Sequence, residues 1–138
     1  MKAGLFLDTS GWFAALSERD PHHARAAAYY RDTLDAGRFA LVTTNLVVAE
    51  MHALMTRARG VAAGVQFLDR LYEDTLHDIV WATRDLQRQA IDRWLRPFRD
   101  HRFSLTNAVS FEVMRSRSLD AALATDRHFA AAGFRLVP

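Results

Sequence analysis

Short apolar segments alternate with longer amphipathic segments along the whole chain, and this alternation limits the fold more than any other feature. The first short segment, AGLFLD at residues 3–8, is apolar on both faces and ends at an acid, as buried parallel strands do. Further strands are predicted at residues 39–43, 77–81, 121–125 and 134–138. Strands that alternate with helices over short connections predict an α/β fold, in which a central, mostly parallel sheet lies between two layers of helices.

The helix pattern has recognisable starts and stops. Helices are expected at residues 9–16, 21–36, 45–60, 60–74, 83–98 and 104–117. Asp20 and Pro21 are typical of a helix start, and Gly37 is typical of a helix end. Because the two helices between residues 45 and 74 follow each other almost immediately, we expect a helical hairpin there.

Composition sets the class of protein. The 138 residues match one domain, and 50% hydrophobic with 25% charged residues is typical of a globular chain. No repeat or Gly-, Ser- or Pro-rich linker interrupts the pattern, so we expect a single domain over residues 1–138.

The chain has no cysteine, which excludes disulfide bonds, thiolate zinc sites and a cysteine nucleophile. Its first apolar run is too short for a signal peptide or a membrane span, so we expect a soluble, cytoplasmic protein. Net charge is only +2, and nearly every basic residue is arginine. Arginine suits phosphate contacts, although the same bias also follows from genome base composition, so the charge favours a nucleic-acid partner only weakly.

Two acidic residues follow predicted strands. Asp8 ends the first strand, and Asp126 comes directly after the strand at residues 121–125. Both carboxylates are expected at the same edge of a parallel sheet, where functional groups collect. Each would serve equally well as the N-cap of the helix that follows it.

Two further polar residues lie on helix faces that the pattern predicts to be buried. Glu50 shares a stripe with Val47 and Met51, so we expect it on or beside the buried face, where it is paired with an arginine, snorkels from an edge position or binds a metal. Asn107 aligns with Phe111 and should point inward, where an amide needs hydrogen-bond partners. Its alternative role is a purely structural hydrogen bond to the backbone.

The acidic positions together suggest a metal site. Asp8, Glu50 and Asp126, with Asp100 just before the last long helix, would supply hard oxygen ligands of the kind that hold Mg²⁺ or Mn²⁺.

Four ordered motifs give the chain a resemblance to the PIN-domain family, and within it to the VapC-like toxins of bacterial toxin–antitoxin pairs. These motifs are LFLDTSGWFAAL, TTNLVVAEMHAL, DHRFSLTNAVSFEVMR and ALATDRHFAAAGFRLVP. The resemblance implies an acidic pocket for a divalent metal ion, formed by residues that fall here on Asp8, Glu50, Asn107 and Asp126. Asn107 is a departure, because the family has an aspartate in the corresponding "SLTDA"-like segment. Asp100 matches an acidic position often seen just upstream and is expected to support the site.

The implied activity is metal-dependent hydrolysis of RNA phosphodiesters by an endoribonuclease. Asn107 removes one negative charge from the site, so we expect an attenuated or inactive enzyme. Ser10, Ser104 and Thr106 would hydrogen-bond ligands or substrate, or else cap helices. Candidate phosphate contacts are Arg84, Arg88, Arg96, Arg102, Arg115 and Arg127, although solvated helix faces explain most of them equally well.

The resemblance also implies a homodimer and a small VapB-like antitoxin that covers a hydrophobic groove. The apolar residues of the predicted hairpin that would supply such surfaces, or else pack in the core, are Met51, Leu54, Met55, Phe67, Leu68 and Tyr72.

Two other functions remain open from the sequence. A catalytically silent PIN domain that binds RNA or an antitoxin is favoured by Asn107. A phosphatase or receiver-like domain with Asp8 as nucleophile is disfavoured, because the segment LFLDTS lacks a second acid near Asp8.

Overall fold

The computed structural model describes residues 3–37 and 39–138. The strands are β1 Ala3–Leu7, β2 Phe39–Thr44, β3 His77–Val80, β4 Ala121–Leu123 and β5 Arg135–Val137. The helices are α1 Thr9–Leu16, α2 His23–Ala36, α3 Asn45–Arg59, α4 Val61–Glu73, α5 Arg84–Ala90, the π-helical segment η1 Ile91–Leu95, α6 Leu105–Ser116 and α7 His128–Ala131.

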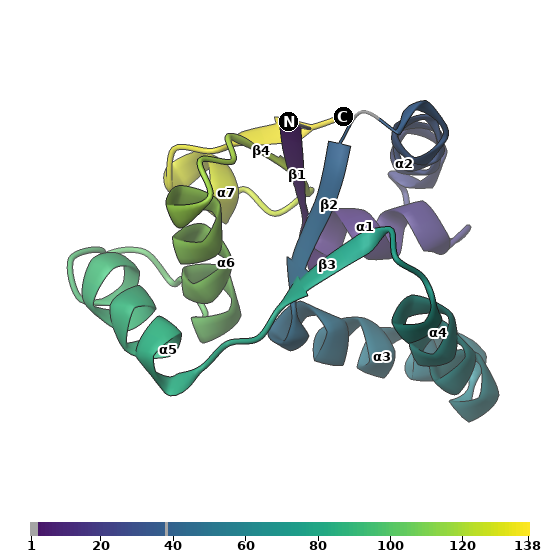
Figure 1. The fold of residues 1–138 in the computed structure, drawn as a ribbon, viewed down its shortest axis with the longest axis horizontal. Helices are drawn as coiled ribbons and strands as arrows, with labels where there is room; N and C mark the ends of the chain where they lie inside the picture. The colour runs from purple at the N-terminus through teal and green to yellow at the C-terminus, as the bar shows by residue number, and fades with distance from the viewer. Residues whose placement is uncertain (1–2, 38) are drawn as a thin grey trace.

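The strands form one sheet in the order β3-β2-β1-β4-β5, and every pair is parallel. Helices α1 to α4 lie to one side of this sheet and α5 to α7 to the other (Figure 1). The predicted three-layer α/β fold is therefore confirmed. After β1 the chain builds outward through β2 and β3, then returns to place β4 on the other side of β1, which makes the carboxyl end of β1 a switch point of the topology.

Helices α3 and α4 form the predicted hairpin, and its boundaries follow from local chemistry. Thr44 caps α3 because its hydroxyl accepts a hydrogen bond from the backbone N–H of Val47 at 3.2 Å. Gly60 joins the two helices with φ 96°, a left-handed conformation that favours glycine.

The helix expected at residues 83–98 differs from the structure. Its α-helical part ends at Ala90 and continues as the π-helical η1, in which the N–H of Arg96 bonds to the carbonyl of Ile91 at 3.0 Å. The wider turn places Trp94 in the core, where its indole N–H donates to the buried carboxylate of Glu112 at 3.1 Å. Burial of this aromatic ring with its polar partner accounts for the departure from α-helical spacing.

Two predicted boundaries also change. Asp20 does not cap α2: its carboxylate accepts from the N–H of His22, and the helix begins at His23, two residues after the predicted start, without a side-chain cap. Strand β4 ends at Leu123, because the N–H groups of Thr125 and Asp126 turn away from the sheet to the hydroxyl of Ser10.

The core lies on both faces of the sheet. On the side of α6 it is strongly aromatic: Phe111 makes edge contacts with Phe103, Phe129 and Trp94 at centroid separations of 5.1, 4.9 and 5.4 Å. These rings form a stiff base beneath the start of α6, where Asn107 lies. No helix among residues 3–37 and 39–138 is long and apolar enough to cross a membrane.

Candidate active site

Asp8 follows β1 at the centre of the sheet and is 4% exposed. It caps α1, because its Oδ2 accepts from the backbone N–H of Ser10 at 3.1 Å and from the Ser10 hydroxyl at 2.5 Å. Burial raises the pKa of Asp8 to about 6; the Ser10 hydrogen bonds oppose this rise, while the charges of Asp126 and Glu50 add to it. The capping role is therefore confirmed, and the same carboxylate lies within the electrostatic influence of two others.

Ser10 joins the ends of β1 and β4. While its hydroxyl donates to Asp8, its oxygen accepts from the N–H groups of Thr125 at 3.0 Å and Asp126 at 3.1 Å. Gly11 allows this approach, since a Cβ at that position would lie 2.3 Å from the backbone of Leu123. The serine therefore holds the segment that carries Asp126 against the cap that carries Asp8.

Glu50 is exposed, so it does not lie on the buried face of α3; it takes the edge position that the sequence left open. The buried face of α3 is formed by Val47, Val48, Met51 and Met55. Glu50 lies about 110° around the helix from the centre of that face, given roughly 100° per residue. It is nevertheless tied to the site, because the hydroxyl of Thr9 donates to its Oε1 at 2.6 Å.

Asn107 is buried, as predicted, and forms a capping box with Ser104. Its Oδ1 accepts from the backbone N–H of Ser104 at 3.1 Å, and this bond fixes which end of the amide is which. The other end, Nδ2, therefore points at Asp126 and donates to its Oδ2 at 3.3 Å. Asn107 thus has both the backbone role and the contact with a site carboxylate that the sequence left open.

His128 is a site residue that the sequence interpretation missed. Its Nδ1 lies 3.3 Å from Oδ1 of Asn107 and 3.4 Å from Oδ1 of Asp126, and its backbone N–H donates to the same carboxylate oxygen at 2.9 Å. The signal available in the sequence was the spacing Asp-x-His after a strand, which brings the backbone N–H of the third residue onto the carboxylate of the first.

The remaining candidates lie farther out. Asp100 is exposed in the turn at residues 97–100, and within the described residues no hydrogen bond links its side chain to Asp8, Glu50, Asn107 or Asp126. Of the six candidate arginines, Arg115 pairs with Glu112 and Arg96 with Asp92, whereas Arg84, Arg88, Arg102 and Arg127 are exposed.

The donor set at the site is made of oxygen atoms, which fits Mg²⁺ or Mn²⁺ better than a softer metal ion. Across residues 3–37 and 39–138, however, no three His, Cys, Asp or Glu side chains gather closely enough to hold a metal ion. Asn107 does not add a ligand on the side of Asp126, because the N–H group that faces Asp126 cannot bind a cation. The chemistry of the site suits a hard cation, with one charge fewer than an all-carboxylate pocket.

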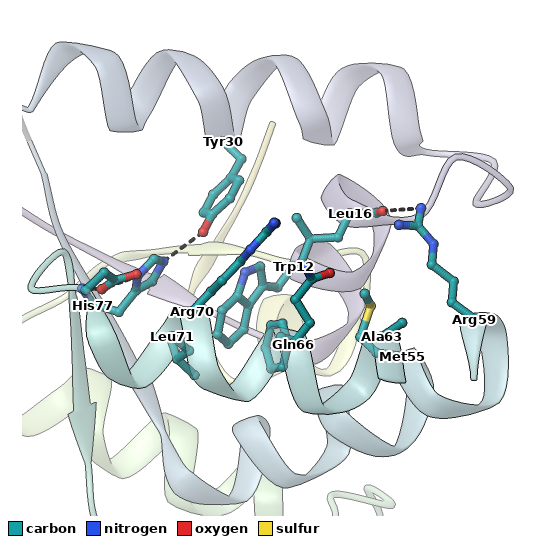
Figure 2. Close-up of a pocket in the computed structure, with 12 residues that line it drawn as sticks. Trp12, Leu16, Tyr30, Met55, Arg59, Ala63, Gln66, Arg70, Leu71 and His77 are labelled. Atoms are coloured by element: carbon teal, nitrogen blue, oxygen red, sulfur yellow. Dashed lines mark hydrogen bonds and ion pairs between the residues drawn. The ribbon is translucent and has the colours of Figure 1, made fainter. Parts of the chain in front are cut away.

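A cavity of about 280 Å³ lies on the side of the sheet that α1 to α4 cover, between α1, α2 and the α3–α4 hairpin (Figure 2). Trp12, Leu16 and Phe67 form apolar walls, and the side chains of Arg59 and Arg70 also line it. Of the apolar hairpin residues, Met51 and Met55 are buried; Leu54, Phe67 and Leu68 are partly buried; and Tyr72 is exposed.

Known proteins resemble this chain over nearly its full length. A family model described as PIN domain matches residues 5–135. The 23S rRNA-specific endonuclease VapC20 of Mycobacterium tuberculosis is 32% identical over 130 residues, which are 94% of this chain and 95% of the relative. The crystal structure of that VapC20, described as a sarcin–ricin loop cleaving toxin, matches with a TM-score of 0.82 at 31% identity, over 95% of this chain and 96% of that one.

A more distant structure supports the fold alone. FitAcB from Neisseria gonorrhoeae matches with a TM-score of 0.67 at 15% identity, over 97% of this chain and 96% of that one. Since the family model spans most of the chain and the VapC20 relative is covered almost end to end, the chain belongs to the PIN-domain family and is a VapC-like endonuclease within it.

Proposed function

We propose that this chain is a metal-dependent toxin endoribonuclease that hydrolyses RNA phosphodiesters at the site formed by Asp8, Asp126 and Glu50, and that it acts in the cytoplasm. The observation that carries the proposal is the Ser10 hydroxyl, which bonds to the Asp8 carboxylate and to the backbone N–H of Asp126 at the switch point of the sheet. Because the relative VapC20 is named for 23S rRNA, that RNA is the first substrate to test.

We assign a different role to each residue of the site. Asp8 and Asp126 would hold a Mg²⁺ or Mn²⁺ ion, with Glu50 as a further ligand or as a base for the attacking water. When bound, such an ion supplies an activated water and neutralises charge that develops on the scissile phosphate. Ser10 fixes the separation of the two aspartates, and Thr9 orients Glu50 through its 2.6 Å hydrogen bond.

We propose further that Asn107 attenuates the enzyme. Its amide contributes no charge, and its N–H donates to Oδ2 of Asp126, so this carboxylate would be a weaker ligand for a cation. Two unit charges 4 Å apart interact by about 4 kcal/mol at an effective dielectric constant of 20, which indicates how much cation binding loses with one carboxylate.

The test is cleavage of 23S rRNA and of a short loop fragment by purified protein with Mg²⁺ or Mn²⁺. Three chains are compared: the present sequence, Asp8→Asn and Asn107→Asp. We expect weak cleavage by the present sequence, none by Asp8→Asn and at least tenfold faster cleavage by Asn107→Asp. Equal rates for the present sequence and Asp8→Asn would reject the proposed site, and equal rates for the present sequence and Asn107→Asp would reject attenuation.

The second candidate function is a catalytically silent PIN domain that binds RNA or an antitoxin. The Asn107–Asp126 hydrogen bond favours it, because it gives the site a stable arrangement that needs no cation. Isothermal titration with Mn²⁺ separates the two functions, since a silent domain would bind RNA while showing no heat of cation binding.

An antitoxin partner is part of the proposal, and the cavity in Figure 2 is its proposed docking site. Apolar walls next to Arg59 and Arg70 suit a partner segment that presents an apolar side chain flanked by acids. Replacing Phe67 by Asp should weaken capture of a cognate VapB-like antitoxin, while cleavage by the free protein stays the same.

A homodimer is the other proposed assembly. Val61, Val65 and Tyr72 lie on one face of α4 and are 71%, 46% and 56% exposed, which gives a second copy an apolar surface to cover. Sedimentation equilibrium should report a dimer that Val65→Glu converts to a monomer.

A further inference from the structure

We propose that the imidazole ring of His101 is a stacking platform for an unpaired base of the RNA, one nucleotide or so away from the cleaved phosphate. This inference rests on the proposed ribonuclease function and names a feature of its substrate, namely a base that is free of its pairing partner. The platform is formed by the loop at residues 96–103, between η1 and α6.

The platform is built from two rings, one buried and one exposed. His101 is exposed, and its ring lies parallel to that of Phe103, with a centroid separation of 5.1 Å and an interplanar angle of 8°. Phe103 is only 8% exposed, and Phe98 contacts the side of His101 at 5.8 Å with a tilt of 52°. One face of the imidazole therefore packs on the core. Because the ring is already fixed in this orientation, the side chain of His101 loses little rotamer freedom when a base stacks on its exposed side.

The same rings connect the platform to the acidic site. Phe103 makes an edge contact with His128 at 5.4 Å, and His128 in turn contacts Asp126. His101 is therefore separated from the site by a single aromatic ring. A strand of RNA whose phosphate lies at Asp126 would bring a neighbouring base across this loop.

Charge around the loop suits a nucleic-acid strand. Arg99 and Arg102 flank His101 in sequence, and both are exposed. Each is available for a phosphate, whereas Arg96 in the same loop is already paired with Asp92 at 2.9 Å. Of the three aromatic rings in this loop, Phe103 is buried and Phe98 is partly buried, whereas His101 is exposed and can take a base.

The chemistry identifies the ligand as an unpaired base rather than a duplex. A base within a helix is covered on both faces by its neighbours, whereas a splayed base in a loop leaves a face for an aromatic side chain such as histidine. Stacking is tolerant of base identity, so we expect a preference for loops over stems rather than for one base.

The experiment measures binding without cleavage. A single-stranded RNA oligonucleotide that carries 2-aminopurine at successive positions is titrated with protein in EDTA, using the wild-type chain and the His101→Ala, His101→Phe and His101→Lys variants. His22→Ala removes an exposed histidine at the start of α2 and serves as the matched control. Cleavage of the same RNA with Mn²⁺ gives kcat and KM separately.

We expect fluorescence quenching at one position, which His101→Ala and His101→Lys abolish and His101→Phe retains. Affinity should fall about tenfold for the two variants without a ring. KM should rise by a similar factor with little change in kcat, because stacking acts in the bound substrate as much as in the transition state. His22→Ala should match the wild type throughout.

Three results would overturn the inference. The first is RNA binding by His101→Ala that equals that of the wild type, and the second is RNA binding by His101→Phe that is as weak as that of His101→Ala. The third is wild-type RNA binding by His101→Lys, which would assign the effect to charge. If the wild type cleaves RNA and His101→Ala cleaves it equally well, the inference fails while the ribonuclease stands. If the wild type neither binds nor cleaves RNA, both fail.

Discussion

The amide of Asn107 donates a hydrogen bond to the carboxylate of Asp126 at 3.3 Å. An aspartate in the same place would bring two carboxylates together, an arrangement that needs a cation or a proton to be stable. The amide of Asn107 therefore stabilises the negative charge of Asp126, as a bound cation would otherwise do in part.

The first prediction follows from this bond. Without metal, Asn107→Asp should lower the free energy of unfolding by about 1 to 2 kcal/mol, because an attractive contact becomes a repulsive one. With Mn²⁺ at 100 times its dissociation constant, the variant should gain about 2.7 kcal/mol. Urea unfolding with and without Mn²⁺ measures both values. A variant that is stable without metal and gains nothing from it would contradict the prediction.

The second prediction concerns Ser10. Ser10→Ala removes one donor to Asp8 and leaves the N–H groups of Thr125 and Asp126 without their acceptor. We expect a loss of about 1 to 3 kcal/mol in stability and a larger relative loss of cleavage, because the two aspartates are no longer held together. Ser10→Thr keeps the hydroxyl and is the control. Similar behaviour of the Ala and Thr variants would show that the hydroxyl is not needed.

The third prediction is a pH dependence that arises from Asp8. Burial raises its pKa from 3.8 to about 6, so between these pH values the folded chain keeps a proton that the unfolded chain has released. Raising the pH through this window should therefore lower the stability of the metal-free protein, by up to about 3 kcal/mol at 1.36 kcal/mol per pKa unit.

Asp8→Asn is the control, and its stability should lack this slope. Mn²⁺ competes with the proton on Asp8, so its affinity for the wild type should fall as the pH drops below about 6. Identical stability profiles for the wild type and Asp8→Asn would refute the assignment.

The fourth prediction is a pH dependence of stability that runs in the opposite direction to that of Asp8. It comes from Glu112, which is buried on α6. Burial raises its pKa, but the hydrogen bonds from Arg115 and Trp94 and the charges of Arg115 and Arg93 outweigh this and hold it below the usual 4.5. The stabilisation from Glu112 should be fully present above pH 4.5 and decline as the pH falls further.

Glu112→Ala should lower stability at pH 7 by about 1 to 3 kcal/mol, since it leaves the indole N–H of Trp94 without an acceptor. Glu112→Gln retains an acceptor and should lose less, and its acid profile should be flatter than that of the wild type. Thermal unfolding from pH 3 to pH 7 checks both, and a Gln variant with an unchanged acid slope would speak against the assignment.

The fold was largely predictable because strand length and helix periodicity are local signals. The ends of β1 and β4 put Asp8 and Asp126 at one edge, as the alternation of elements predicts. The exposure of Glu50 was not predictable in the same way, since its position three residues after Val47 is compatible with either side of the boundary of the buried face. The orientation of the Asn107 amide also required coordinates, because it depends on the backbone N–H of Ser104 and on the side chain of Asp126, which lies 19 residues after Asn107.

The strand order has a consequence for when this protein becomes active during its synthesis. β1, β2 and β3 can pair as soon as residues 3–80 have emerged from the ribosome, but β4 joins β1 only after residue 123 has also emerged. A nascent chain therefore carries the Asp8 half of the centre long before the Asp126 half exists. The centre therefore assembles only when β4 has paired with β1, however early β1, β2 and β3 fold.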